Sequence, residues 1–177
     1  MKFTGRRSKS IRLVLAMVVV LGGCSAPMIN KDNALLAIFV ETKTEDPDLA
    51  RRVEWFRSAP RTAWLESKPV FQPLHHMERA ELVQTADGVP AIRLIFNQRG
   101  KRVLTNVTTV QVGRRFFMMA WYRQNPDDKE MKPRCIGVSH IEKPNNSGQF
   151  VFLPDTTKDE AKQLVKGFNN LAKKIQR

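Results

Sequence analysis

Cysteine and histidine are scarce in this chain of 177 residues, which has two cysteines and three histidines. Because Cys24 lies in a processing signal described below, Cys135 has no partner for an intrachain disulfide, and the fold must rest on a hydrophobic core. A metal centre needs three or four convergent ligands. The adjacent His75 and His76 do not supply them, since neighbouring residues of an extended segment point to opposite sides. We expect neither a metal nor a cofactor.

Long apolar runs and common catalytic motifs are also missing. The sequence has no glycine-rich phosphate loop and no Gly-x-Ser-x-Gly turn. Its longest apolar run, residues 13–21, is shorter than the roughly 20 residues that a permanent transmembrane helix needs. This run follows five basic residues and ends in small residues at Gly22 and Gly23. The order predicts a cleaved secretory signal over residues 1–23.

The end of this signal, Leu-Gly-Gly-Cys at residues 21–24, resembles the lipobox of bacterial lipoproteins. In that motif the cysteine thiol receives lipid, palmitate included, and becomes the new N-terminus. The resemblance implies lipidation of Cys24 and a lipid-anchored protein of the cell envelope that faces the periplasm or the exterior. An ordinary secretory signal and an uncleaved membrane anchor are the alternatives. Twin-arginine export is not expected, because polar residues follow Arg6-Arg7.

Acidic residues are too few to balance the basic ones, and the formal net charge is +13. Residues 1–23 carry five basic residues and no acidic ones, so the rest of the chain has a net charge of +8. An exported protein does not normally meet nucleic acid, and we expect no nucleic-acid partner. Anionic phospholipid headgroups or acidic polypeptide segments are the expected counter-charges.

The first part of the chain predicts a short tether and an antiparallel pair of strands. Residues 24–33 are polar and read as the tether, which leaves a single domain over residues 34–177. Alternating residues predict a strand from Ala34 to Val40. Residues 51–57 fit a strand or a short helix, with 61–66 as the hairpin partner, and 68–77 reads as an irregular connection.

The second part predicts a hairpin, two helices and further strands. Two alternating runs flank Asp87-Gly88, which is a hairpin signature. Asn97 is expected to cap a helix near residues 98–110, with Val103, Leu104, Val107 and Val110 on its apolar face and Gly113 at its end. Residues 115–122 are apolar on both faces and predict a central strand. Further strands are expected at residues 135–138 and 149–153.

The last element is predicted to be an amphipathic helix. Thr157 and Glu160 have capping-box spacing. Its apolar positions recur at helical spacing and its lysines lie off that face. The apolar positions are Ala161, Leu164, Val165, Phe168, Leu171, Ala172 and Ile175, and the lysines are Lys158, Lys162, Lys166, Lys173 and Lys174. The predicted fold is a two-layer α+β sandwich, a mainly antiparallel sheet packed by two helices.

The order of elements over about residues 78–177 resembles the head subdomain of the first large periplasmic domain of SecD, a protein-export membrane subunit. The matching pieces are VPAIRLIFNQRG at 89–100, VGRRFFMMAW at 112–121, a proline before a short strand at 133–136, and SGQFVF at 147–152 followed by TTKDEAKQLVKGFNN at 156–170. Residues 34–77 have no counterpart. The resemblance implies a fold, an envelope location and contact with exported chains.

This chain also departs from SecD. That subunit has several membrane-spanning helices that couple export to proton flow, and no such segment follows residue 23 here. The chain is therefore not expected to be a proton-driven motor. Because a fold alone does not fix a function, we expect a non-catalytic domain that binds an exported polypeptide or an envelope partner.

Two other classes of function stay open. A small thiol or hydrolytic enzyme would use Cys135 with His140, but such chemistry needs an orienting group and an oxyanion site, and a buried structural thiol is expected instead. Asp127, Asp128 and Glu130 read as a solvated loop rather than paired catalytic acids. The third class is a basic module on anionic headgroups.

The candidate binding residues lie on two elements. If helices cover only one side of the sheet, Phe117, Met119 and Trp121 are partly exposed and mark a binding surface. On the last helix, Lys162, Lys166 and Lys173 are candidates for contact with anionic headgroups.

Overall fold

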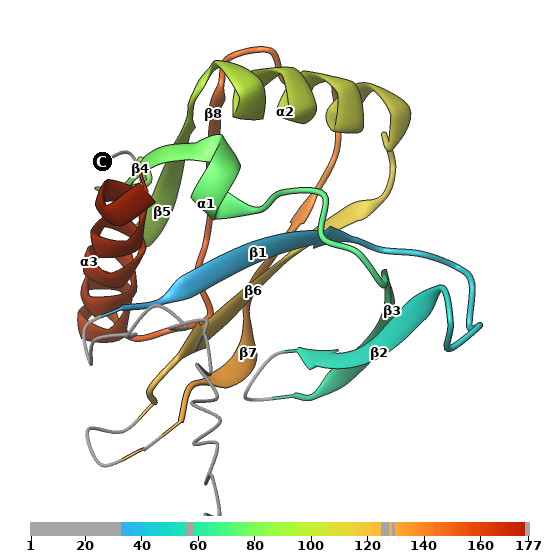
Figure 1. The fold of residues 1–177 in the computed structure, drawn as a ribbon, viewed down its shortest axis with the longest axis horizontal. Helices are drawn as coiled ribbons and strands as arrows, with labels where there is room; N and C mark the ends of the chain where they lie inside the picture. Colours follow the sequence, from blue (N-terminus) through green and yellow to red (C-terminus); the bar gives the residue numbers. More distant parts are fainter. Residues whose placement is uncertain (1–32, 56–58, 125–127, 129, 176–177) are drawn as a thin grey trace, which may run out of the picture.

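The computed structural model describes residues 33–55, 59–124, 128 and 130–175, and it has an α+β fold. All strand pairs are antiparallel. The elements are β1 (Leu35–Val40), β2 (Ala50–Trp55), β3 (Arg61–Glu66), α1 (Pro73–His76), β4 (Met77–Gln84), β5 (Pro90–Phe96), α2 (Gln98–Val110), β6 (Arg115–Tyr122), β7 (Lys132–His140), β8 (Gln149–Phe152) and α3 (Lys158–Ile175). The predicted class is confirmed, with the strands divided among three sheets (Figure 1).

The central sheet has the order β1-β6-β7, so β6 is its middle strand, as predicted. Alternate residues of β6 face opposite sides, and both sides are buried. Phe116 and Met118 join the main core, which also contains residues from β4, β5, α2 and α3. Phe117 and Met119 join a second buried cluster. A strand that is apolar on both faces thus receives cover on both faces.

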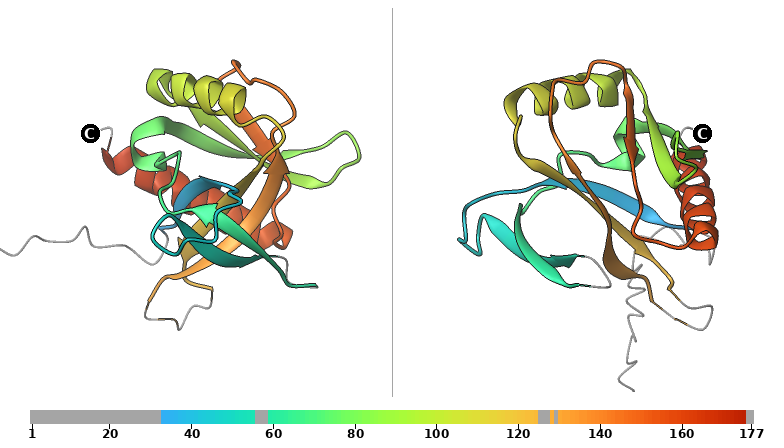
Figure 2. Two further views of the ribbon diagram at one scale, coloured as in Figure 1. Left: turned by 90° about the vertical axis from the view of Figure 1, so that its right-hand side faces the viewer. Right: turned by 180° about the vertical axis from the view of Figure 1, so that it is seen from behind.

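The main core lies between the central sheet and a second sheet of order β4-β5-β8. The predicted hairpin at Asp87-Gly88 is confirmed, with Gly88 at a φ of 76°. Its turn projects away from the body of the domain (Figure 2). Helix α3 contributes the buried Leu164 and Phe168 to the core, and its Asn169 side chain bonds both backbone groups of Ala80 on β4. The amide of Asn169 therefore takes the place of a neighbouring strand at that point of the sheet edge.

The other face of the central sheet is covered by the β2–β3 hairpin. The alternative that residues 51–57 form a helix is wrong for Arg51–Trp55, which pair with β3. The Trp55 ring meets Phe117 edge to face with centroids 5.8 Å apart. The Arg51 guanidinium lies 4.1 Å from the centroid of Phe39. The hairpin thus closes a side of the sheet that the sequence left without predicted cover.

The chain joins the domain beside α3. Asn33 and Ala34 are buried, and a methyl group on Gly167 would lie 2.6 Å from the Ala34 nitrogen. Asn33, the last residue of the predicted tether, therefore belongs to the packed domain. The predicted signal 1–23, Cys24 and the remaining tether residues lie outside the described residues.

Helix α2 follows its prediction with two corrections. The Asn97 side chain accepts a hydrogen bond from the Gly100 N–H at 2.9 Å, which confirms the N-cap. Val110 was placed on the apolar face but is 71% exposed, because the helix ends there without a packing partner. Gly113 has a φ of 85°, two residues beyond the C-cap Gln111, so it serves the following turn rather than the cap itself.

Residues 68–77 are more ordered than the predicted irregular connection. Val70 donates its N–H to the Ile38 carbonyl at 2.9 Å, and Phe71 forms a bridge with Ile38. The helix α1 follows directly. This segment covers the outer edge of β1.

Candidate functional site

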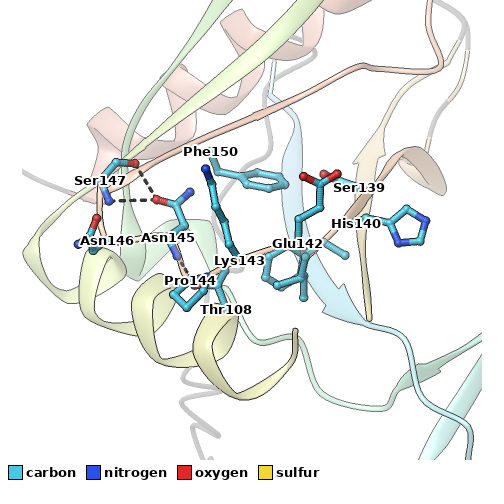
Figure 3. Close-up of a pocket in the computed structure, with 12 residues that line it drawn as sticks. Thr108, Ser139, His140, Glu142, Lys143, Pro144, Asn145, Asn146, Ser147 and Phe150 are labelled. Carbon is cyan, nitrogen blue, oxygen red and sulfur yellow. Dashed lines mark hydrogen bonds between the residues drawn. The ribbon is translucent and has the colours of Figure 1, made fainter. Parts of the chain in front are cut away.

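A cavity of about 510 Å³ lies where the end of β7, the loop 141–148 and the second half of α2 meet (Figure 3). Sites that hold small ligands commonly measure about 300–1,000 Å³. Its lining residues come from α2, β6 and the stretch 139–150: Thr108, Phe116, Ser139, His140, Ile141, Glu142, Lys143, Pro144, Asn145, Asn146, Ser147 and Phe150. This cavity is the candidate binding site of the domain.

Side-chain hydrogen bonds hold the loop in its shape. The buried Thr108 hydroxyl donates to the Leu104 carbonyl at 2.7 Å and accepts from the Asn145 N–H at 2.8 Å. The Asn145 side-chain oxygen then accepts from both the N–H and the hydroxyl of Ser147, at 3.0 and 2.7 Å. Asparagine and serine stabilise such turns by bonding to nearby backbone. The loop is therefore fixed to α2.

The cavity combines an apolar floor with a polar rim. Phe116 and Phe150 meet edge to face with centroids 5.5 Å apart. His140, Glu142 and Lys143 are exposed at the rim, and in the view of Figure 3 the charged ends of Lys143 and Glu142 lie on either side of the Phe150 ring. The floor suits an apolar side chain of a ligand. The rim suits the backbone groups of a ligand, together with one positive or one negative charge.

The Cys135–His140 pair of the enzyme alternative is not assembled. Both residues are on β7, where Cys135 faces Met119 and His140 faces Arg115. Five residues of extended strand separate them by roughly 16 Å. Burial raises the pKa of the Cys135 thiol to about 11, and its exposed fraction is 6%. The expected buried thiol is confirmed, and the two residues do not form a nucleophile–base contact.

His75 and His76 are in α1, where their contacts are structural. The Gln72 N–H donates to His76 Nδ1 at 3.3 Å, and the His75 carbonyl accepts from the Asn97 side chain at 3.0 Å. Burial, with a smaller effect of the Arg99 charge, lowers the pKa of His76. In the part of the chain that the structure describes, no three His, Cys, Asp or Glu side chains gather as metal ligands would.

The exposed β6 stripe predicted from the sequence is largely covered. Phe117 and Met119 are 0% and 8% exposed beneath the β2–β3 hairpin, so the exposure expected of them is wrong. Trp121 is half-buried at the rim of that cluster. The hairpin fills the space in which these three residues were expected to bind a partner.

The predicted lysines lie on the outer face of α3. Lys162, Lys166 and Lys173 are exposed, and their spacing places them in one row along the helix. Lys162 contacts Asp159 at 3.2 Å in a fully surface pair. Such a pair contributes about 0–1 kcal/mol to stability, so the row keeps its positive charge toward solvent.

A partly buried polar cluster joins α3 to the central sheet, and the sequence did not reveal it. The Glu160 carboxylate accepts from Tyr122 at 2.5 Å and from Arg134 at 2.7 Å. Arg134 also donates to the Asp155 carbonyl. Burial and the bond to Glu160 raise the pKa of Tyr122 to about 12. The capping-box prediction found half of this role, since Thr157 accepts from the Glu160 N–H at 3.2 Å.

Comparison with known proteins finds similarity at the level of fold. No protein-family model and no curated protein sequence matches the chain. A solved structure of SecDF, described as a membrane component that enhances protein export, has a TM-score of 0.54 and 16% identity over 78% of this chain and 63% of its own. A crystal structure of SecDF in a super-membrane-facing form has a TM-score of 0.54 and 16% identity over 77% of this chain and 18% of its own. The chain thus spans less than two thirds of either structure.

This similarity agrees with the SecD-like fold expected from the sequence, and it extends over more of the chain than the last hundred residues. SecDF is described as a membrane component. Within the residues described here, no helix has the length and apolar character needed to cross a bilayer.

Proposed function

We propose that this protein is a lipid-anchored component of the bacterial envelope whose SecD head-like domain binds an exported polypeptide, or a polypeptide segment of an envelope partner, without catalysis. The observation that carries the proposal is the SecDF-like fold placed behind a signal that ends in Leu-Gly-Gly-Cys. The first feature favours contact with polypeptide chains, and the second favours an anchor at Cys24.

The cavity at the end of β7 supports a binding role. Its aromatic floor and its mixed rim suit a short polypeptide segment. By contrast, the thiol of Cys135 is buried and far from His140. The geometry therefore favours recognition over a thiol-based reaction.

Anchoring is tested with Cys24→Ala. We expect the variant to accumulate as an unlipidated precursor or to leave the membrane fraction, as judged by metabolic labelling with a fatty acid and by fractionation. Cys135→Ser is the matched control, because it changes the other cysteine and should leave labelling intact. Acylation of the Cys24→Ala protein would contradict the proposed anchor.

Polypeptide binding is tested by crosslinking in cells, with a photoreactive amino acid at Asn146 on the cavity rim. Newly exported chains, or one envelope protein, should be captured by the lipidated protein. The same group at Asp87, at the tip of the β4–β5 turn, is the control. Equal capture from both positions would mean that the cavity is not the binding site.

A second candidate function is contact with anionic phospholipid headgroups through the lysine row of α3. The observation that favours it is the placement of Lys162, Lys166 and Lys173 on the exposed side of the helix beside which the chain enters the domain. A basic residue near an anionic membrane contributes about 1 kcal/mol to binding. We therefore expect binding to anionic liposomes that weakens as salt is raised.

The control for this second candidate changes the same amount of charge elsewhere. Replacing the three α3 lysines with glutamine should abolish most liposome binding. Replacing the exposed Lys43, Lys68 and Lys101 should have a smaller effect. No binding at low salt, or equal loss in both variants, would leave the lysine row with a role in solubility alone.

A further inference from the structure

Hydrogen bonds on either side of β6 show which backbone groups of β7 face outward. The Arg115 carbonyl accepts from Glu41 beside β1, whereas the Arg114 carbonyl accepts from Ile141 at the end of β7, both at 2.9 Å. Backbone groups alternate in direction along an antiparallel strand. Ser139, opposite Phe116, therefore bonds to β6, and the N–H and C=O groups of Val138 and His140 point away from the sheet.

The same reasoning applies to β8. The Gly148 carbonyl accepts from Phe96 at 2.9 Å, so Phe150 and Phe152 bond to β5. Gln149 and Val151 then point their backbone groups outward. Those of Gln149 are bonded to the side chain of Ser147. Within the described residues, the outward groups of Val138, His140 and Val151 have no partner.

Strands β7 and β8 meet at one end and separate at the other. The Asp155 N–H donates to the Ile136 carbonyl at 2.7 Å. The Phe152 ring lies against Gly137, where a methyl group would be 2.7 Å from the ring. Farther along, Ser139 and His140 of β7 and Phe150 of β8 line the cavity. The outward groups of His140 therefore lie at the cavity, and those of Val138 are the next outward groups along the same edge of β7. We call this stretch, between the edges of β7 and β8, the slot.

Two other sheet edges, those of β4 and β1, are each covered at one point. Asn169 bonds both backbone groups of Ala80 on β4, at 2.7 and 2.9 Å. Val70 and Phe71 cover β1 at Ile38. Proteins usually cover or disrupt sheet edges, because an open edge pairs with other chains. The slot beside β7 thus differs from these covered edges in leaving its donors and acceptors available.

We propose that an extended polypeptide segment binds in this slot as an added strand, pairing with the backbone of Val138 and His140. This inference rests on the proposed polypeptide-binding function and names the site and the form of the ligand. Backbone pairing supplies affinity in such complexes, and alternate side chains supply selectivity. One apolar side chain of the segment enters the floor formed by Phe116 and Phe150.

The charges at the mouth fit this occupant. Lys143 and Glu142 both line the cavity, are exposed, and present one charge of each sign. A segment with an apolar residue between an acidic and a basic flank complements both charges. Because the main contacts are to backbone, many sequences satisfy this requirement. Whether a second copy of the chain occupies the slot instead is decided by the test below.

The test uses the full-length protein in detergent and a fluorescent peptide in which valine alternates with threonine, flanked by one glutamate and one lysine. We expect saturable binding that slows hydrogen exchange at the Val138 and His140 amides and leaves the already bonded Ser139 amide unchanged. N-methylation of alternate peptide residues should abolish binding in one register and spare it in the other. Equal tolerance of both N-methylated series would overturn the strand model.

Two variants of His140 distinguish the contribution of its backbone N–H to peptide binding from that of its side chain. His140→Pro removes an outward N–H without removing a bond to β6, as proline does on strand edges. It should weaken peptide binding roughly tenfold. His140→Ala keeps the N–H and should therefore weaken peptide binding clearly less than His140→Pro does. Equal loss in both variants would assign recognition to the imidazole and overturn the proposal.

The other possible results of these experiments also support or reject the proposal. If His140→Pro does not fold, exchange at Val138 and His140 in the unchanged protein settles the question. Retained crosslinking of exported chains with no protection of these amides would place polypeptide binding elsewhere. No peptide binding and no crosslinking would reject the proposed function itself. Protection that grows with protein concentration in the absence of peptide would identify a second copy as the occupant.

Discussion

Replacing Gly100 with alanine tests how closely α2 packs against the end of α1. In an exposed helix this change stabilises by roughly 0.5–1 kcal/mol, because glycine is the weaker helix former. Gly100 is buried in the first turn of α2, where a methyl group would lie 2.1 Å from the His76 carbonyl oxygen. That oxygen is part of the backbone, so no side-chain rotation relieves the overlap. Either α2 or α1 has to move.

Such a movement affects identifiable contacts. The Asn97 N–H donates to the His76 carbonyl at 3.0 Å, and the Asn97 side chain donates to the His75 carbonyl at 3.0 Å. Each bond contributes about 0.5–1.5 kcal/mol, and overpacking costs about 1–3 kcal/mol. After subtracting the gain in helix propensity, we expect Gly100→Ala to lower the free energy of unfolding by about 3 kcal/mol.

Thermal unfolding followed by circular dichroism measures this loss. At about 2–4 °C per kcal/mol for a domain of this size, the midpoint should fall by roughly 6–12 °C. Asn106→Ala is the control, because Asn106 is exposed on the same helix and the change raises helix propensity without a new contact. A Gly100→Ala protein that melts with the control would refute the close approach of α2 to His76.

Three other predictions concern the core, the thiol and a partly buried ion pair. Leu164→Ala and Phe168→Ala should each lower the free energy of unfolding by about 2–5 kcal/mol in urea titrations, since both side chains are 1% exposed; a loss below 1 kcal/mol would argue against α3 as part of the core. Cys135 should resist alkylation at neutral pH until the protein is unfolded, because burial raises the pKa of its thiol to about 11; rapid native labelling would show that it is accessible. The hydrogen bond from Arg115 lowers the pKa of Glu41 below its ordinary 4.5, so this carboxylate stabilises the fold above that pH and the contribution is lost as pH falls through the folded pKa. Glu41→Gln should therefore reduce stability at pH 7 and flatten its decline in acid, and an unchanged pH profile would contradict the pairing.

The sequence predicted those elements whose signals are local. Asn97 caps α2 through a bond to Gly100, only three residues away. Gly88 takes the positive φ that a tight hairpin turn requires. The α3 pattern needs only the repeat of the helix to show which side is buried. In each case the interaction that fixes the structure lies within a few residues, so the pattern alone was sufficient.

The candidate site could not be predicted in this way, because its contacts join distant residues. Thr108 holds the loop through Asn145, 37 residues later. Phe116 forms the floor with Phe150 from another sheet. His140 was singled out as a partner for Cys135, yet its contribution to the cavity comes from its place at the end of β7. Residue type alone therefore suggested an incorrect chemical role.

The apolar pattern of β6 on both faces implies cover on both sides of the central sheet. A strand with Phe116 on one face and Phe117 on the other needs cover on both, because either ring left in water would lose about 1.5–3 kcal/mol of burial. Only two helices are predicted from the sequence, and if both cover the same side of the sheet, the other face is left partly exposed. The missing cover is the β2–β3 hairpin, whose Trp55 packs on Phe117.

Whether a strand edge is covered also depends on residues that are distant in the sequence. The bond that closes β4 at Ala80 comes from a side chain 89 residues away, and the segment at Val70 that closes β1 carries no strand pattern of its own. A sequence pattern shows which face of a strand is apolar, but the backbone groups at its edge are the same in every residue except proline. The open edge beside Val138 and His140 is therefore identified by the hydrogen bonds of its neighbours. For this reason the proposed strand acceptor is tested by removing a backbone N–H, with the side chain as its control.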